Sequence, residues 1–403
     1  MTATVTWPLL IVLASLTAVA PVATDLYLPG FPAIGAELGA NASGVQLTLT
    51  TFLVGLALGQ LAMGPLSDRY GRRAPLIAGT ALCALAGVVC AVAPSLSVLV
   101  GARFVQGFAG AAGMVIGRAV ISDLVEGRAA ARAFTLLVTV GGVAPVLAPL
   151  VGGLLSGPVG WRGMLWVVAL LCALMVVGVV LVVPETRLGD ISEKSPPGVT
   201  GDISEMSPAR AVASARGFWP PVAVFALSFG VMMAYIAASP FLYQDVMGLS
   251  EIEYGLAFGV NAAGLITAGA VAGRLVSRFH PALMILWCVA VQVASTVLFL
   301  ALAVSGAPPW TFAVVIFAAV TCNGGIMGNS AALAMEPVRA VAGTGSAILG
   351  FCQFAVGALV SPLVGLGGSG SATVPALVMA LCSLGGGLAA SRQSSSSTAT
   401  ATS

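Results

Sequence analysis

The sequence predicts an all-α integral membrane protein of twelve transmembrane helices, arranged as two six-helix bundles with both termini in the cytoplasm. Composition, long apolar stretches and the placement of basic residues lead to this fold class. Of 403 residues, 59% are hydrophobic and 7% are charged, whereas about a quarter of an ordinary soluble domain is charged. Such a chain cannot cover itself with polar groups. The net charge of +2 is small and dispersed, which argues against a nucleic-acid partner.

Twelve apolar stretches are each long enough to cross a hydrocarbon core of ~30 Å at about 1.5 Å per residue. The first six cover residues 5–28, 44–66, 74–93, 95–120, 133–156 and 163–183. After a polar interruption, six more cover residues 217–243, 254–273, 281–304, 308–335, 340–366 and 371–390.

A charged turn at residues 64–73 separates the second and third stretches. Gly64 and Gly71 allow a chain reversal that bulkier residues resist. Four charged side chains of the turn are too costly to place in hydrocarbon and therefore mark a membrane exit: Asp68, Arg69, Arg72 and Arg73.

Basic residues fix the predicted orientation. Of the 16 lysines and arginines, 14 fall in segments on the side that both termini share, Arg162 falls on the other side, and Arg103 lies inside a stretch. Short loops rich in lysine and arginine stay in the cytoplasm. Both termini are therefore predicted to be cytoplasmic.

The predicted domains are an N-terminal bundle (1–183), a cytoplasmic linker (184–216), a C-terminal bundle (217–391) and a disordered Ser/Thr-rich tail (392–403). The linker contains a polar tandem duplication, residues 189–196 and 201–208, and is predicted to be flexible.

A faint repeat relates the two bundles. Five residues recur 209 positions later with the same identities: Gly55, Leu56, Gly64, Leu66 and Arg69 match Gly264, Leu265, Gly273, Leu275 and Arg278. Such a repeat predicts two bundles related by an axis along the membrane normal, with the substrate site between them near the midplane.

Two ionisable residues lie well inside the apolar stretches, Asp25 and Arg103. Intramembrane charges usually face a cavity or a partner. Their similar depth predicts that both face a central cavity and can pair directly or through water, and that Asp25 carries a coupling proton. A static ion pair that fixes two helices is the alternative.

Several motifs resemble those of the major facilitator superfamily. The 64–73 turn matches the loop signature between its second and third helices. Residues 24–32 and 103–107 with 117–119 and Asp123 resemble the Bcr/CflA branch of drug:proton antiporters, which confers bicyclomycin and chloramphenicol resistance. The resemblance implies that Arg103 takes part in proton coupling, and that Asp68 and the arginines of the turn latch against the start of stretch 340–366. The arginines could instead act only as topology determinants.

The fifth stretch resembles the antiporter motif of exporters, with Ala144 and Ala148 where glycines are usual. Paired prolines bend a helix and small residues permit close contact: the motif comprises Pro145, Pro149, Gly152 and Gly153. An ordinary kinked packing helix is the alternative.

Candidate substrate-cavity residues are polar side chains inside the stretches, each of which could equally bridge helices: Tyr27, Gln46, Asn261, Asn323 and Gln353. The one histidine, His280, lies in a loop, and the seven cysteines form no CxxC pair. They are predicted to be core residues. No metal, no cofactor and no enzymatic activity are therefore expected.

Together these features predict a monomeric, multi-pass protein of the bacterial plasma membrane. Its predicted partners are the lipid bilayer, protons and a small-molecule substrate. The predicted function is proton-coupled efflux of a small hydrophobic, phenicol-like drug by alternating access. A neutral substrate is favoured because one acid and one base in a shared cavity leave little net charge. The alternatives are export of an endogenous metabolite or amino acid, and proton-coupled import.

Overall fold

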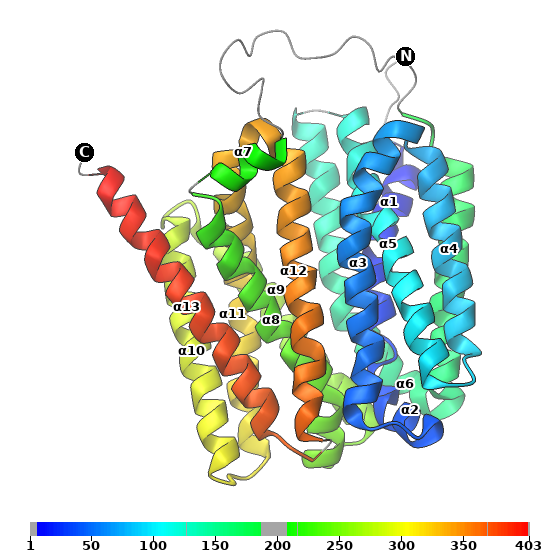
Figure 1. Ribbon diagram of the computed structural model, residues 1–403, viewed down its shortest axis with the longest axis vertical. Helices are drawn as coiled ribbons and strands as arrows, with labels where there is room; N and C mark the ends of the chain where they lie inside the picture. The colour runs from blue at the N-terminus through cyan, green and yellow to red at the C-terminus, as the bar shows by residue number, and fades with distance from the viewer. Residues whose placement is uncertain (1–5, 126, 187–207, 216, 369, 402–403) are drawn as a thin grey trace.

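The computed structural model describes residues 6–125, 127–186, 208–215, 217–368 and 370–401, and these residues form a bundle of long helices (Figure 1). Eleven helices in this part of the chain are long and apolar enough to cross a membrane, which agrees with the predicted fold class. The predicted count of twelve crossings stays a prediction, as does the cytoplasmic side of the termini.

The N-terminal half contains α1 (Trp7–Asp25), η1 (Leu28–Gly30), α2 (Phe31–Leu38), α3 (Ala42–Tyr70), α4 (Arg73–Ala91), α5 (Leu96–Leu124) and α6 (Gly127–Val182). Helical structure extends beyond the first predicted stretch, which covers residues 5–28. After a break over residues 26–30, helical structure resumes as α2, which the sequence had not predicted. Proline at position 29 cannot donate the hydrogen bond that would continue α1.

The fifth and sixth predicted stretches both lie in α6. Its backbone leaves the helical conformation at Gly160, where φ is 64° and ψ is −179°. Side-chain-bearing residues rarely adopt this positive φ, whereas glycine does so at little cost. Gly160 therefore separates the two stretches.

The C-terminal half contains α8 (Trp219–Phe241), η2 (Leu242–Val246), α9 (Glu251–Leu275), α10 (Pro281–Val304), α11 (Trp310–Met335), η3 (Glu336–Val341), α12 (Ala342–Val364), η4 (Gly365–Gly367) and α13 (Thr373–Ala401). Of the predicted linker, only α7 (Pro208–Ser214) and a few flanking residues are described, and most of the tandem duplication lies outside the described residues.

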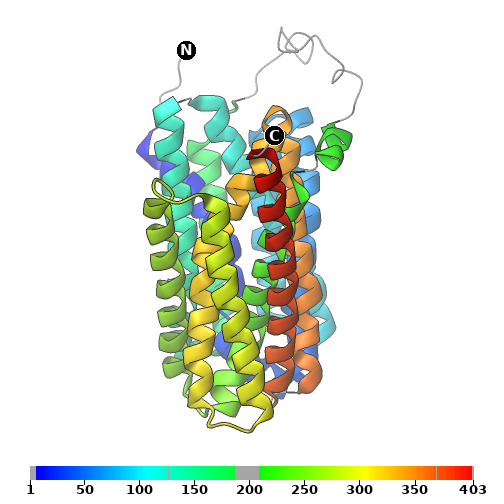
Figure 2. The same ribbon diagram turned by 90° about the vertical axis from the view of Figure 1, so that its left-hand side faces the viewer.

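α13 differs from the prediction at its end. It continues as a helix to Ala401, through a segment whose Ser/Thr-rich composition had predicted disorder from residue 392. Extending an existing helix costs far less than nucleating one, which accounts for helical structure in a segment of weak helix formers. Figure 2 shows α13 beside α10 along one face.

Glycines set the closest helix contacts in both halves. A Cβ atom at Gly55 or Gly107 would meet the backbone of the partner helix where α3 crosses α5, and one at Gly324 would meet the backbone of α9. Small residues let helices approach this closely inside a membrane. Glycine therefore allows a close approach of helices in both the α3–α5 pair and the α9–α11 pair.

The two halves meet along two helix pairs, α3 with α12 and α6 with α9; Figure 1 shows α3 and α12 side by side. We call the end of the molecule with the 64–73 turn the turn end. At the opposite end the halves are joined by several contacts: the Gln244 amide donates to the Pro29 carbonyl oxygen at 3.1 Å, and the rings of Phe31 and Phe241 lie 6.1 Å apart.

Candidate functional site

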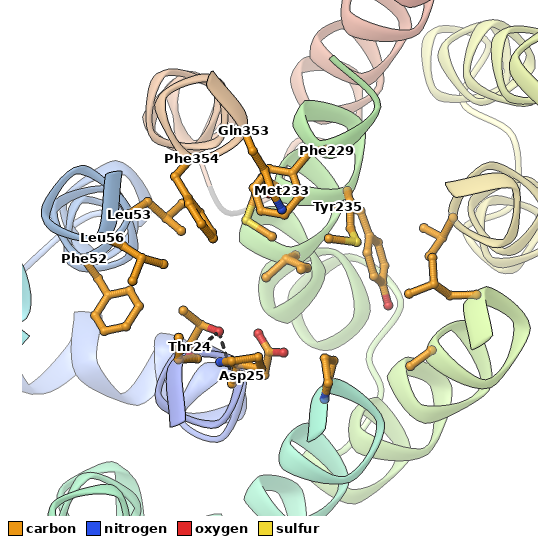
Figure 3. Close-up of a pocket in the computed structure, with 18 of the residues that line it drawn as sticks. Thr24, Asp25, Phe52, Leu53, Leu56, Phe229, Met233, Tyr235, Gln353 and Phe354 are labelled. Carbon is orange, nitrogen blue, oxygen red and sulfur yellow. Dashed lines mark hydrogen bonds between the residues drawn. The ribbon is translucent and has the colours of Figure 1, made fainter. Parts of the chain in front are cut away.

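A central cavity of about 210 Å³ lies between the two halves. Its wall is mostly aromatic and aliphatic, and both halves supply it (Figure 3). The lining residues include Thr24, Asp25, Phe52, Leu53, Leu56, Met114, Pro145, Phe229, Met232, Met233, Tyr235, Phe258, Val320, Gln353 and Phe354. Asp25 is the one charged side chain among all those that line it. This position of the cavity agrees with a substrate site between two bundles.

Asp25 is the last residue of α1, where the helix breaks. Pro21, one turn earlier, removes a backbone hydrogen bond, and the Thr24 hydroxyl donates to the carbonyl oxygens of Ala20 (3.2 Å) and Pro21 (2.9 Å). Asp25 is only 3% exposed. Figure 3 shows Thr24 and Asp25 on the wall facing Phe229 and Met233 of α8. The carboxyl group thus lies at the cavity wall, as predicted for Asp25.

Arg103 does not line this cavity, although it had been predicted to share it. The residue is fully buried; its Nη1 donates to Gln106 Oε1 at 2.7 Å. Its guanidinium carbon lies 4.5 Å from the ring centroid of Tyr27 and 4.3 Å from that of Phe52. Aromatic faces attract a desolvated cation. The partners of the Arg103 guanidinium are therefore these two rings and the Gln106 amide, and not the predicted Asp25 carboxylate.

No Asp25–Arg103 ion pair occurs among the described residues. Arg103 lies one layer of side chains behind the cavity, because Phe52, whose ring it contacts, lines the cavity. Two of its nitrogens, Nε and Nη2, are buried without a hydrogen-bond partner in the structure. Such groups are costly, so Arg103 is held in an incompletely satisfied pocket.

Of the five predicted cavity residues, only Gln353 lines the cavity. Two others in the N-terminal half make structural bonds. The Tyr27 hydroxyl pairs with Thr48 Oγ1 at 2.9 Å, and Gln46 Nε2 donates across the interface to the Ala237 carbonyl oxygen at 2.9 Å. Gln46 therefore bridges the halves.

The two predicted asparagines lie behind the cavity wall of the C-terminal half. Asn261 Nδ2 donates to the hydroxyl oxygens of Tyr235 (2.9 Å) and Tyr243 (3.0 Å). Asn323 is fully buried, and neither polar atom of its side chain has a partner in the structure. Asn261 therefore orients Tyr235, which does line the cavity.

The aromatic and methionine wall was missed by sequence reasoning. Phe52, Phe229 and Met233 occur in helices whose apolar residues are spread over all faces. Neither their residue type nor their spacing therefore distinguishes cavity-facing positions from core or lipid-facing ones.

Arg72 is the centre of an ion-pair network at the turn end. It contacts Asp68 (Nη1–Oδ1 2.7 Å) and Asp123 (Nε–Oδ2 3.0 Å), and donates to Ser67 Oγ at 2.8 Å. Burial acts to lower the pKa of Arg72, but the hydrogen bonds and charges of Asp123 and Asp68 outweigh it and raise the pKa. Arg72 therefore stays charged.

Glu185, which follows α6, holds the start of α4. Its carboxylate accepts hydrogen bonds from the backbone N–H groups of Arg72 (2.8 Å) and Arg73 (3.0 Å), where the helix dipole favours an anion. Gly71 has a φ of 84° and leaves room for this carboxylate. Sequence reasoning had not assigned Glu185 a role.

The remaining residues of the predicted latch make local contacts. The guanidinium of Arg69 lies 5.4 Å from the Tyr70 ring centroid, and Arg73 Nη2 donates to the Val180 carbonyl oxygen at 2.8 Å. Gly64 lies in α3 opposite Val115 of α5. These contacts stay inside the N-terminal half, so the predicted latch to the start of α12 stays a prediction.

The motif in α6 packs against both halves. Pro145 lines the cavity. A Cβ atom at Gly152 would meet the backbone of Leu26, and one at Gly153 would meet that of Glu251 at the start of α9. The Pro149 carbonyl oxygen closely faces Gly255. These small residues therefore join α6 to the break after α1 and to α9.

Comparison with known proteins identifies the family. Residues 13–362 match the model of the Major Facilitator Superfamily, so the chain belongs to this superfamily of membrane transporters. It is 35% identical over 356 residues to "Uncharacterized MFS-type transporter YdgK" of Bacillus subtilis, covering 88% of this chain and 87% of the relative.

Two further relatives are named for drug resistance. The chain is 29% identical over 368 residues, 89% of each protein, to "Bicyclomycin resistance protein homolog" of Haemophilus influenzae. It is 27% identical over 353 residues, 86% of each, to "Multidrug resistance protein MdtL" of Escherichia coli. These similarities confirm the resemblance to the Bcr/CflA branch.

Solved structures support the fold. A D-xylose-proton symporter aligns with a TM-score of 0.74 at 15% identity, over 96% of this chain and 97% of the other. An inward-facing bacterial homologue of the lysosomal transporter Spinster aligns with a TM-score of 0.72 at 18% identity, over 96% of each chain. The family match and the curated relatives, together with the apolar helices, identify a multi-pass transporter of the bacterial inner membrane and not an enzyme.

Proposed function

We propose that this transporter exports a small hydrophobic compound in exchange for protons by alternating access. The observation that carries the proposal is the position of Asp25, a lone carboxyl group on the wall of an otherwise apolar cavity between the two halves. Acidic residues inside membrane segments commonly serve as proton relays. The drug-resistance names of two relatives support an outward direction.

In this mechanism Asp25 binds a proton when the cavity faces the outside and releases it when the cavity faces the cytoplasm. The contacts between the halves opposite the turn end, such as Gln244 with Pro29, separate in one state, and the α3–α12 contacts near the turn separate in the other. Arg103 contributes its positive charge from behind Phe52. Twelve crossings, cytoplasmic termini and a monomeric state belong to the same proposal.

The charge of the substrate is less restricted than the sequence had indicated. A neutral, phenicol-like compound was favoured because an acid and a base were expected to share the cavity, but only Asp25 lines it. Five aromatic residues surround the same space: Phe52, Tyr235, Phe229, Phe258 and Phe354. A compound with one positive charge fits this wall as well as a neutral one does.

The test uses purified protein in vesicles with an imposed pH gradient and a panel of phenicols and hydrophobic monocations. The wild-type protein should move at least one compound uphill, and Asp25→Asn should abolish that movement while downhill exchange continues. Thr24→Val, which changes the neighbouring side chain without a charge, is the matched control. Uphill transport by Asp25→Asn would contradict the proposal.

The same vesicles distinguish the two alternatives. An exporter of an endogenous metabolite or amino acid would exchange those compounds and not the drugs. An importer would accumulate substrate on the side to which protons flow. Neither result is expected.

A further inference from the structure

Arg118 is a charged residue of α5 that the proposed mechanism does not use. The predicted stretch 95–120 placed it near a membrane exit, among the cytoplasmic basic residues. The structure continues α5 to Leu124, so Arg118 lies about 9 Å before the end of this helix. Its side chain is nevertheless exposed. A charge inside a membrane segment usually faces a water-filled space or a partner.

Three sides of α5 are covered by its own half. The helix packs against α1, α3 and α4. Small residues mark these contacts: Gly113 faces Leu16 of α1, Gly107 faces Phe52 of α3, and Ala112 faces Gly79 of α4. The exposed face of α5 is therefore the fourth side, which points toward the other half and not toward lipid.

Arg118 lies on this fourth side, next to the central cavity. Met114 lines the cavity, and Arg118 follows it by one turn on the same face of α5. The Arg118 Nε donates to the Met114 carbonyl oxygen at 3.0 Å, so the side chain folds back toward the cavity. Among the described residues, no carboxylate pairs with Arg118. Its positive charge is thus not offset at this place.

Arg118 also lies between the cavity and the turn end. A Cβ atom at Gly117, its neighbour, would lie 3.9 Å from Leu13 of α1. Asp25 lies about 18 Å farther along α1, away from the turn end. The opposite end of the molecule is closed by the contacts between the halves described above. A compound that comes from the turn end therefore passes Arg118 before it reaches Asp25.

A fixed charge at this place acts on the approach of a compound more than on its binding. Exposed charges are largely screened beyond ~8 Å at physiological salt, and Asp25 is farther away than this even if Arg118 folds back by one turn of about 5 Å. A charge at the rim of a site mainly changes the association rate and its salt dependence. Arg118 should slow the entry of cations and speed that of anions.

On the basis of the function proposed above, we propose that Arg118 is a specificity-determining residue at the turn-end entrance of the central cavity. Its charge favours neutral and anionic hydrophobic compounds over cations of the same size. The cavity wall accepts a monocation, but a neutral compound reaches that wall faster.

Two thiol reagents of opposite charge test the entrance without any transport. The reporter is Gln353→Cys on the cavity wall, in purified full-length protein whose seven native cysteines are replaced by alanine. An anionic and a cationic alkyl thiosulfonate each react with this thiol. The ratio of their rate constants, anion over cation, is divided by the same ratio for a free thiol. Arg118→Gln should lower this ratio about fivefold to tenfold, and Arg118→Lys should keep it within about twofold because the charge remains.

The matched control is Arg392→Gln, which removes one charge from α13, on the side of the second half that faces away from α5 (Figure 1). The ratio should stay within about twofold. At about 1 M salt, where the screening length is ~3 Å, the parent and Arg118→Gln should become equal. Equal ratios at low salt, or an equal fall in Arg392→Gln, would overturn the inference. If Arg118→Gln fails to fold, a parent ratio that does not change with salt would overturn it.

The thiol ratio separates this inference from the proposed function. Failure of Asp25→Asn to affect uphill transport would contradict proton coupling but leave the ratio as it is. In vesicles that transport, Arg118→Gln should raise the initial rate for a hydrophobic monocation, relative to that for a phenicol, by about fivefold. An unchanged relative rate would overturn the role of Arg118 in specificity.

Discussion

The two halves share a packing plan but differ in the polar groups they bury. In the described part of the N-terminal half, three charged residues are buried: Asp25, Arg72 and Arg103. The buried polar residues described in the C-terminal half are all neutral, for example Asn261, Gln292 and Asn323. Since buried charges are costly and usually functional, we infer that the N-terminal half carries the ion coupling and that the C-terminal half mainly shapes the cavity.

The variant expected to reduce transport most is Arg103→Met. It removes a buried charge held by Gln106 and two rings, and we expect pH-driven transport to fall about 100-fold or more. Arg103→Lys should recover little, because lysine cannot reproduce a stacked guanidinium.

The matched variant in the other half is Gln292→Met, which removes a buried amide bonded to Ser228 and to the Ala319 carbonyl. Transport should change less than about threefold. Equal losses in the two variants, measured as initial rates in vesicles at equal protein density, would contradict the division of roles.

An intermediate effect is expected at the turn. Asp68→Asn weakens the ion pair with Arg72 and should reduce transport about tenfold while membrane insertion stays normal. Ser277 occupies the equivalent position of the second half and only donates to the Arg274 carbonyl at 2.9 Å, so Ser277→Ala should have no effect. Inverted or lost insertion of Asp68→Asn, seen by cysteine labelling from each side, would favour a role in topology.

The smallest effect compares two equivalent glycines. A Cβ atom at Gly55 would come within 2.8 Å of the Phe108 backbone nitrogen, whereas at Gly264 it would meet the side chains of Phe317 and Thr321. Gly55→Ala should destabilise the protein by about 1–3 kcal/mol and Gly264→Ala by less, because side chains can move aside. Thermal unfolding in detergent measures both. An equal fall in Tm would mean that the second contact is as rigid as the first.

Asp25 illustrates what the sequence could predict. Its charge is unusual inside an apolar stretch, and the cost of burying it required a cavity or a partner. The structure supplies the cavity. The charges of residues 64–73 likewise indicated a chain reversal at a membrane exit, but the reversal is shorter than predicted. Residues 64–70 belong to α3, and only Gly71 and Arg72 lie between α3 and α4.

Arg103 illustrates what the sequence could not predict. Depth along two helices gave a similar height for Arg103 and Asp25, but not the direction of either side chain. The ring of Tyr27 comes from the break after α1 and that of Phe52 from α3, and no local pattern in the sequence predicts either contact. The sequence could not predict the partner of Gln46 either, because Ala237 is 191 positions away. The contact between Cys83 and Cys172 likewise joins residues 89 positions apart.

The length of α13 has a practical consequence. Its 29 residues span about 43 Å at 1.5 Å per residue, more than the ~30 Å of a hydrocarbon core. The helix therefore continues past Arg392, where the candidate membrane span ends. A fluorescent reporter attached near its tip would magnify any rocking of that half, so single-molecule distance measurements against the first half become a direct way to watch the transport cycle.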